Sequence, residues 1–364
     1  MKFRLDGRAI VARLEAVERR RWLFDNLGLD PRHAAWFRER AWIRTIHGTT
    51  RIEGNSLNEL EVEDVLDQRA KALPRKDALE IIDTQAALTF ADEIGRDAKT
   101  RIDEPVIREV HRRVLADIDP MLTPGAYRKG SNRVADAQGN TIFTTPPSGD
   151  VPDLMRQLGL WLRKAPDHPP AAAAAIAHLE LVAIHPFYDG NGRTARALSR
   201  LILVRHGYAL DGLVSLDAYL DHQRRDYFAA IRSAIGRSYE PGYDATPFVG
   251  YFLDAIVGAA DHVLARIKGL TVLLHRLRED AGRGLIPARM VDGLVYAWIN
   301  GGIRPSDYMR ISAVTGPTAS RDLKAAARAG LLRSSGQTRT RRYLPTDRLR
   351  RTGPVPVTSY GKPR

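Results

Sequence analysis

Helical periodicity runs through most of this chain, and one long segment interrupts it. Charged amphipathic stretches such as residues 75–95 repeat their apolar positions at the spacing of a helix. Residues 124–155 lose that spacing and are rich in Gly, Asn and Pro, and their DAQGNT centre at 136–141 is a hairpin-turn signal. The pattern therefore predicts a mainly α protein that carries one β-hairpin.

Length and composition fit a globular protein with more than one core. The chain has 364 residues, enough for two or three domains, and 44% of them are hydrophobic. The absence of cysteine excludes disulfides, zinc–thiolate sites and cysteine nucleophiles. Residues 1–22 read as a charged amphipathic helix, not as a signal peptide, and no eighteen apolar residues run unbroken. We expect a cytoplasmic protein with no membrane partner.

The positive charge is concentrated at one end of the chain. The formal net charge is +13, and residues 301–364 hold fourteen Lys or Arg against three Asp or Glu, whereas the remainder is nearly balanced. A basic segment attached to a neutral body suggests a separate module for a polyanion such as nucleic acid. The alternative is an ordinary solvated surface.

The sequence IHPFYDGNGRTAR, residues 184–196, gathers several groups that bind and activate phosphates. A residue before proline is pushed out of helical geometry, so a helix should end at His185, and a new one should begin near Gly192. Gly190 and Gly192 let the backbone N–H groups turn inward as an anion cradle at a helix N-terminus. Arg193 and Arg196 lie three apart on one face of the new helix and can both reach phosphate oxygens.

Two further side chains in this loop supply the remaining chemistry. Asp189 could hold a magnesium ion that bridges phosphates, because this cation takes one or two carboxylates plus substrate oxygens. His185 is the only nearby side chain suited to accept a proton at neutral pH. Singly, each residue could be structural or surface-exposed; together they suffice to transfer a phosphorus group to a hydroxyl. His178, seven positions before His185, is expected to be structural.

The same stretch resembles the signature of the Fic family: His-Pro-Phe, any residue, Asp or Glu, Gly-Asn-Gly-Arg, two residues, Arg. The resemblance implies an all-helical core with a β-hairpin flap. It also implies AMPylation, the transfer of AMP from ATP to a Ser, Thr or Tyr hydroxyl of a protein, with pyrophosphate leaving. Both loop glycines are present, which favours nucleotidyl transfer over the phosphate transfer of relatives that depart from this glycine pattern.

The resemblance assigns a role to each position of the loop. His185 would be the base that deprotonates the target hydroxyl, and Asp189 would be the Mg²⁺ ligand. Arg193 and Arg196 would hold the β- and γ-phosphates. The full set implied to bind ATP in this loop is Asp189, Gly190, Asn191, Gly192, Arg193, Thr194, Ala195 and Arg196.

Two other stretches resemble parts of the same fold. Residues 125–134 resemble the flap, whose edge at Asn132, Arg133 and Val134 would align a target segment by strand addition. Residues 219–228, YLDHQRRDYF, resemble the helix beside the adenine. Core packing is the alternative for the aromatic candidates on that helix, which are Tyr219, Tyr227 and Phe228.

Residues 49–54 resemble the inhibitory motif of the family, in which a Ser or Thr is followed after three residues by Glu and then by Gly or Asn. The resemblance implies that Glu53 pairs with Arg196 and occupies the space of the γ-phosphate. Because the segment precedes the core, it resembles the class with an N-terminal inhibitory helix. By itself, Glu53 would be a surface carboxylate near a helix end that Gly54 can terminate.

The basic C-terminal region looks like a winged helix-turn-helix. In residues 316–332, three cationic residues share one helical face while Ala319, Leu323 and Ala326 can face a core. Residues 333–345 alternate polar and cationic residues about a Ser-Gly turn, as a two-stranded wing would. Such modules bind duplex DNA, although some serve as protein docking modules. The DNA-binding candidates are Arg321, Lys324 and Arg328 on the helix and Arg339, Arg341 and Arg342 for phosphates.

These features predict an adenylyltransferase with an appended C-terminal module. Its expected partners are ATP and a hydroxyl-bearing protein, and a homodimer is one option for its assembly. Two alternatives stay open: a DNA-binding transcriptional regulator whose core senses nucleotide or modifies itself, and removal of AMP at the same site. The expected segments are an N-terminal helical region at 1–100 with the inhibitory helix near 45–54, the Fic core at 101–265, a linker helix at 266–285, the winged helix-turn-helix at 286–348 and a disordered basic tail at 349–364.

Overall fold

The computed structural model describes residues 1–69, 73–135, 138–163, 168–336 and 341–351. The chain divides into two compact units. The first holds residues 1–27 and 42–259, and the second holds residues 28–41 and the described residues from 260 onward. Helices α2 (Pro31–Ile52) and α11 (Thr246–Gly282) each contribute residues to both units.

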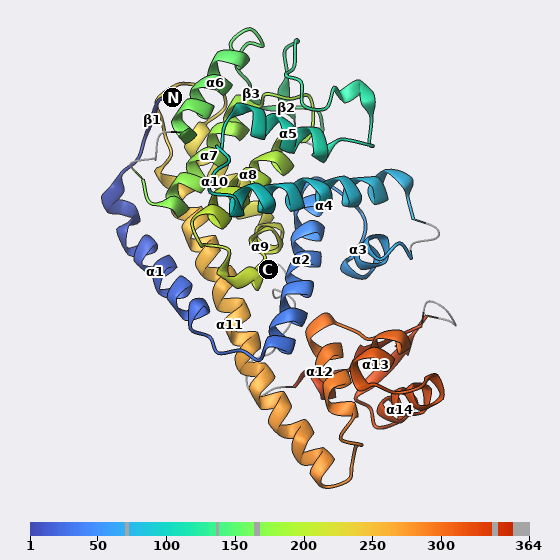
Figure 1. The fold of residues 1–364 in the computed structure, drawn as a ribbon. Helices are drawn as coiled ribbons and strands as arrows, with labels where there is room; N and C mark the ends of the chain where they lie inside the picture. Colours follow the sequence, from blue (N-terminus) through green and yellow to red (C-terminus); the bar gives the residue numbers. More distant parts are fainter. Residues whose placement is uncertain (70–72, 136–137, 164–167, 337–340, 352–364) are drawn as a thin grey trace. The chain divides into compact units, whose positions relative to one another are not determined.

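Two helices form the centre of the first unit. Helix α7 (Pro170–Ile184) is Ala-rich and buried on nearly every side, so it packs closely against α8 (Asn191–Arg205) (Figure 1). Helices α4 (Arg75–Arg96), α5 (Glu104–Val114) and α6 (Val151–Arg163) pack around this pair. The remaining elements of the unit, with those three, are β1 (Phe3–Arg4), α1 (Gly7–Asp25), α3 (Glu59–Leu66), α4 (Arg75–Arg96), α5 (Glu104–Val114), η1 (Pro120–Leu122), β2 (Arg133–Ala135), β3 (Thr141–Thr144), α6 (Val151–Arg163), η2 (Leu210–Gly212), α9 (Leu216–His222), α10 (Arg224–Ile235) and β4 (Tyr243–Asp244).

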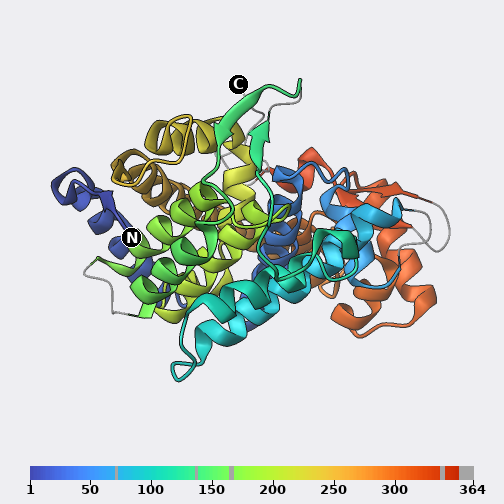
Figure 2. The ribbon, with the colours of Figure 1, turned by 90° about the horizontal axis from the view of Figure 1, so that it is seen from above.

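The predicted hairpin is confirmed in β2 and β3, which pair antiparallel with Val134 opposite Phe143. Figure 2 shows the hairpin extending from the helices of the first unit. The other edge of β3 is covered, because Thr144 exchanges backbone hydrogen bonds with Arg237 and Tyr239. Among the described residues, the outer edge of β2 has no paired strand. Part of the predicted turn, residues 136–137, lies outside the described residues.

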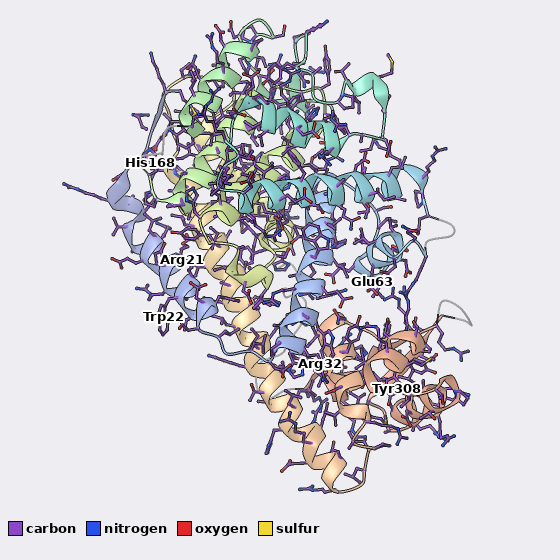
Figure 3. All side chains as sticks on the ribbon, viewed as in Figure 1. Arg21, Trp22, Arg32, Glu63, His168 and Tyr308 are labelled. Atoms are coloured by element: carbon purple, nitrogen blue, oxygen red, sulfur yellow. The ribbon has the colours of Figure 1, made fainter. Side chains whose placement is uncertain are left out.

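The described part of the second unit combines four short helices with a small antiparallel hairpin. Tyr308 donates a hydrogen bond to Asp322, which also pairs with Arg289, and these contacts join α13 to α14; Figure 3 marks Tyr308. This order of helices and strands matches the one expected for a winged helix, whose identity stays a prediction. The elements are α12 (Met290–Asn300), α13 (Pro305–Ser312), α14 (Gly316–Arg328), β5 (Leu332–Ser335), β6 (Arg342–Pro345) and α15 (Asp347–Arg350).

Two segments differ from the boundaries drawn on the sequence. The linker helix expected at 266–285 is the second half of α11, a single helix of 37 residues. Leu349 and Arg350, assigned to a disordered tail, belong to α15, because the Leu349 side chain is fully buried. Residues 352–364 of that tail lie outside the described residues.

Helix α11 is also the one described helix that is long and apolar enough to cross a membrane. Of its most apolar stretch, 56% is buried inside the protein, as is usual for the core helix of a globular domain.

Helices α2 and α9 approach each other closely at Gly48. The Thr45 hydroxyl donates to the Ser215 hydroxyl at 3.0 Å, and a Cβ on Gly48 would lie 2.7 Å from the backbone of Asp217 and Ala218. The helices can therefore meet at this spacing only where α2 has no side chain.

We expect Gly48→Ala to destabilise the protein by about 1 to 3 kcal/mol, because the added methyl group meets backbone atoms that cannot move aside. The measurement is the midpoint of urea unfolding. Gly7→Ala is the matched control, since a Cβ there has nothing within 4 Å. Equal midpoints for both variants would show that the α2–α9 contact is loose.

Candidate active site

The predicted phosphate-binding loop joins α7 to α8. Helix α7 ends at His185, whose left-handed backbone (φ 50°, ψ 59°) turns the chain before Pro186. Helix α8 begins after Gly190, which is also left-handed (φ 73°). A non-glycine residue with positive φ is strained and needs support. The Arg128 guanidinium provides it by donating from Nε to the His185 carbonyl at 2.9 Å.

Asn191 closes this loop on itself. Its Oδ1 accepts the Phe187 N–H at 3.0 Å, and its Nδ2 donates to the Phe187 carbonyl at 2.9 Å. The side chain of Thr194 is similarly occupied, because its hydroxyl donates to the Gly190 carbonyl at 2.8 Å. The side chains of Asn191, Thr194 and the buried Ala195 therefore shape the loop. The Thr194 N–H is also used, since it donates to the Gly190 carbonyl at 2.9 Å, so an anion would be met by the earlier amides of the first helical turn, such as that of Gly192.

His111, on α5, supports the loop from outside and was not found by sequence reasoning. Its ring stacks on Phe187 with centroids 3.5 Å apart. Its Nδ1 accepts the Gly125 N–H at 2.9 Å, so its Nε2 carries the proton and donates to the Asp189 carbonyl at 3.0 Å. Burial lowers the pKa of His111 to about 4, which keeps this tautomer neutral. A buried histidine on an amphipathic helix gives no sequence signal of a partner 78 residues away.

His185 is arranged as a proton acceptor. Its Nδ1 lies 3.4 Å from the Val182 carbonyl, which can only accept, so Nδ1 carries the proton and Nε2 keeps its lone pair. Burial is the main cause that lowers the pKa of His185 to about 4, and the Arg128 charge adds to it, while the Val182 carbonyl, Glu53 and Asp189 oppose it. The imidazole is therefore neutral at physiological pH.

Arg193 is a buried residue of this site, and part of its guanidinium has no hydrogen-bond partner among the described residues. Its side chain is 3% exposed, its NH2 group is 3.5 Å from the Asp189 carboxylate, and its Nε and NH1 have no hydrogen-bond partner among the described residues. A buried guanidinium with unused donors costs free energy unless an anion satisfies them. Burial raises the pKa of Asp83, on α4, to about 6, and the Arg193 charge opposes that rise.

Arg196 is bound by the predicted inhibitory residue. Its NH2 group donates to the Glu53 Oε1 at 2.6 Å, and both side chains lie at the N-terminus of α8. A Cβ on Gly192 would collide with the Glu53 carboxylate, so that carboxylate sits directly on the glycine of the anion cradle. Burial alone would raise the pKa of Glu53, but Arg196, Arg193 and His185 together hold it below its usual value.

The aromatic candidates on the α9–α10 segment lie in different surroundings. Tyr227 is buried, and its hydroxyl is 2.8 Å from His178 Nε2 and 3.5 Å from Arg196 NH1. This places Tyr227 behind Arg196 and not on an open adenine surface. Tyr219 is half-buried and packs against Gly258. Phe228 is 40% exposed, so it is the more accessible candidate for stacking on a base.

The flap residues reach the loop. Asn132 Nδ2 donates to the Phe187 carbonyl at 3.3 Å, and the Asn132 carbonyl accepts the Thr145 hydroxyl. Arg133 is exposed on the outer strand, and Val134 is half-buried. The edge proposed for target alignment is therefore connected directly to the phosphate-binding loop.

A magnesium ion fits this site only together with a substrate. Among the described residues no group of three or more His, Asp or Glu side chains could hold a metal. Asp189 is one half-exposed carboxylate beside the cradle, and Mg²⁺ commonly takes one or two carboxylates plus phosphate oxygens and water. The donor set therefore suits an ion that arrives with a nucleotide.

The DNA-binding candidates separate into two groups. Arg321, Lys324 and Arg328 are exposed on one face of α14, opposite the buried Ala319, Leu323 and Ala326, as the periodicity predicted. Arg342 was predicted to contact phosphates, but it is buried, with 7% of its surface exposed. Arg341 is half-buried, and Arg339 lies outside the described residues.

Comparison with known proteins agrees with this geometry. Residues 101–203 match the Fic/DOC family. The chain is 30% identical over 222 residues to the protein adenylyltransferase Fic of Aedes aegypti, covering 59% of this chain and 40% of that protein. It is 32% identical over 259 residues to the protein of the same name from Drosophila grimshawi, covering 70% and 49%. The chain thus spans less than half the length of these relatives.

Two solved structures share the fold. A Fic family protein from Desulfovibrio desulfuricans G20 superimposes with a TM-score of 0.62 at 23% identity, covering 95% of this chain and 98% of that one. Fic-1 (aa134–508) from C. elegans superimposes with a TM-score of 0.58 at 26% identity, covering 71% and 73%. Residues 101–203 of this chain therefore form a domain of the Fic/DOC type.

Proposed function

We propose that this protein is an adenylyltransferase that transfers AMP from ATP to a Ser, Thr or Tyr hydroxyl of a protein and is inhibited by its own Glu53. The observation that carries the proposal is the Glu53 carboxylate on Gly192, bound to Arg196 at 2.6 Å, in a cradle otherwise suited to phosphate. The Glu53 carboxylate occupies this position as an anion of the same chain, which indicates that the cradle beside the neutral His185 can bind an anion. The names of the relatives support the class of reaction.

The chemistry follows from the groups in the loop. The Nε2 of His185 takes the proton of the target hydroxyl, and the hydroxyl oxygen then attacks the α-phosphorus of ATP. The new P–O bond forms as the bond to the β-phosphate bridging oxygen breaks, and pyrophosphate leaves. Arg193 and Arg196 hold the β- and γ-phosphates, so they stabilise the charge that accumulates on the leaving group. A Mg²⁺ ion held by Asp189 would neutralise part of the phosphate charge.

The flap offers a way to present the target. Among the described residues no further strand pairs with the outer edge of β2, and Asn132 connects this strand to the loop that contains His185. An extended target segment can add to this edge as a further strand. Main-chain pairing fixes the position of the segment along β2 without requiring a particular sequence. The register of that pairing therefore decides which hydroxyl-bearing residue faces His185.

Inhibition follows from competition for one arginine. Glu53 is on the same chain as Arg196, and a tethered group acts at a high effective concentration. ATP can then bind only with its γ-phosphate displaced, which disturbs the in-line geometry that transfer requires.

We expect Glu53→Gly to raise AMP transfer roughly thirtyfold, corresponding to loss of a charge-assisted contact of about 2 kcal/mol. The measurement is transfer of label from α-labelled ATP to the protein itself and to lysate proteins. Glu53→Gln keeps the side-chain volume without the charge, so it should give an intermediate rate. Unchanged or lower transfer by a folded Glu53→Gly protein would contradict inhibition. Loss of only an AMP-removing activity would instead identify Glu53 as a hydrolytic base.

The assignment of His185 as the base predicts both a mutant and a pH profile in the Glu53→Gly background. His185→Ala should lower transfer by about 10²- to 10⁴-fold while ATP binding persists. Because the pKa of His185 is about 4, its neutral form dominates above pH 5, so transfer should not change between pH 6 and 8 through this group. A histidine titration near pH 6.5, or full activity of the alanine variant, would refute the assignment.

A second candidate function rests on the second unit. Arg321, Lys324 and Arg328 form an exposed cationic face on α14, the second helix of a helix-turn-helix. Such a helix fits the major groove, and its cations can pair with phosphates. This supports duplex DNA as a partner, either of a regulator or of a targeted enzyme.

If α14 binds DNA, the full chain should bind duplex DNA with an affinity that falls steeply with salt. The double variant Arg321→Glu, Lys324→Glu should weaken DNA binding by about tenfold or more, because two attractive contacts with phosphates become repulsive. The control is Arg8→Glu, Arg19→Glu on α1, which makes the same charge change elsewhere. Absence of binding by the unaltered chain at low salt would favour protein docking.

A further inference from the structure

Arg196 is held by more groups than Glu53. Its Nε donates to the Thr49 hydroxyl at 2.7 Å, and its NH2 group donates to the Thr49 carbonyl at 3.0 Å. Thr49 is 1% exposed and lies one helical turn before Glu53 on α2. Helix α2, which ends one residue before Glu53, therefore makes two further hydrogen bonds to the same guanidinium, and neither of them involves Glu53.

A directed chain of hydrogen bonds reaches Arg196 from the opposite side. The Ser199 hydroxyl donates to the Ala195 carbonyl at 2.9 Å, so it accepts from His178 Nδ1 at 3.0 Å. His178 Nε2 then accepts the Tyr227 hydroxyl proton, and the Tyr227 oxygen keeps a lone pair for Arg196 NH1 at 3.5 Å. Burial, with a further contribution from the Arg196 charge, lowers the pKa of His178 to about 3, so this direction holds across the physiological range.

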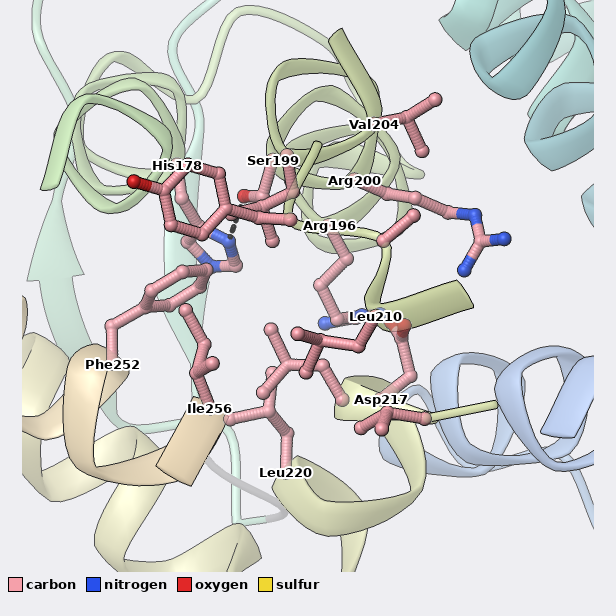
Figure 4. A pocket seen from close by; sticks show the side chains of 15 residues that line it. His178, Arg196, Ser199, Arg200, Val204, Leu210, Asp217, Leu220, Phe252 and Ile256 are labelled. Atoms are coloured by element: carbon pink, nitrogen blue, oxygen red, sulfur yellow. Dashed lines mark hydrogen bonds and ion pairs between the residues drawn. The ribbon is translucent and has the colours of Figure 1, made fainter. Parts of the chain in front are cut away.

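Asp217 completes the surroundings of Arg196. Its Oδ1 lies 3.7 Å from Arg196 Nε, and both side chains are buried. Figure 4 shows Arg196, Asp217, His178 and Ser199 around a cavity of about 50 Å³ behind the site. Burial raises the pKa of Asp217, and the Arg196 charge opposes that rise, so the arginine keeps this buried carboxyl neighbour when Glu53 is replaced.

We propose that Thr49 and Tyr227 are positioning residues that fix Arg196 for the γ-phosphate, so that the inhibitory segment also builds the site that Glu53 blocks. The proposal rests on the assignment of Arg196 to the γ-phosphate within the proposed function. Glu53 is then a competitor for a preformed site, and exchange of its carboxylate for a phosphate leaves the other contacts of Arg196 intact. Loss of Thr49 is therefore not equivalent to loss of Glu53.

Two matched pairs of variants test this in the Glu53→Gly background. Thr49→Val removes the hydroxyl that holds Arg196, whereas Thr50→Val removes a neighbouring buried hydroxyl that bonds only to the Ile46 and His47 carbonyls of its own helix. Tyr227→Phe removes the second contact. Its control is Tyr243→Phe, whose hydroxyl bonds to Glu180.

The readout is calorimetric binding of ATP and of ADP, both with Mg²⁺. We expect Thr49→Val and Tyr227→Phe to weaken ATP about tenfold and to leave ADP unchanged, because only ATP has the γ-phosphate. The KM for ATP in transfer should rise in parallel. Both control variants should match the Glu53→Gly protein.

Equal weakening of ATP and ADP would overturn the proposal, as would identical binding by the Thr49 and Thr50 variants. If Thr49→Val does not fold, Tyr227→Phe decides by the same criterion. The binding assay needs no transfer, so the selective loss of ATP affinity would support the positioning role even in a protein that transfers no label. Failure of the proposed reaction is thereby distinguished from failure of this inference.

Discussion

The contact on which the site depends is the ion pair between Glu53 and Arg196 above Gly192. In the proposed function the carboxylate and the γ-phosphate of ATP are alternatives, because both are anions and the cradle at Gly192 accommodates one of them. Because Arg196 is buried and tied to Thr49, Tyr227 and Asp217, it cannot swing aside to serve both. In the proposed function this single arginine therefore serves both the inhibited state and transfer.

The rest of the first unit keeps that arginine and the base at fixed places. Pro186 ends α7, the left-handed His185 turns the chain, and Asn191 closes the loop before α8 begins. His111 and Arg128 brace the loop from α5 and from the segment before the flap. Such buried polar contacts specify one arrangement of the backbone, since any other would leave several groups unpaired. The neutral state of His185 follows from the same burial.

Sequence reasoning reached the loop, the hairpin and Glu53 because each depends on local residue order or on a short motif. The exposed and buried faces of α14 also followed from periodicity. Other features depend on contacts between distant segments. His111 gave no signal for its place beside Phe187. Core packing was the alternative for Tyr227, a candidate for adenine, and only the structure shows that this side chain is buried and hydrogen-bonded to His178. Arg342 was assigned to phosphate although it is buried, because a charge pattern does not report which side of a strand faces a core.

The central claim is that Glu53 and the γ-phosphate exclude each other at Arg196. Crystal structures of the unaltered chain and of Glu53→Gly, each with a non-hydrolysable ATP analogue and Mg²⁺, test it most directly. We predict that the unaltered chain retains the Glu53–Arg196 pair with the γ-phosphate displaced, and that the Glu53→Gly chain binds the γ-phosphate on Arg196 and the Gly192 amide. An unaltered chain in which Arg196 contacts both Glu53 and the γ-phosphate would contradict the account.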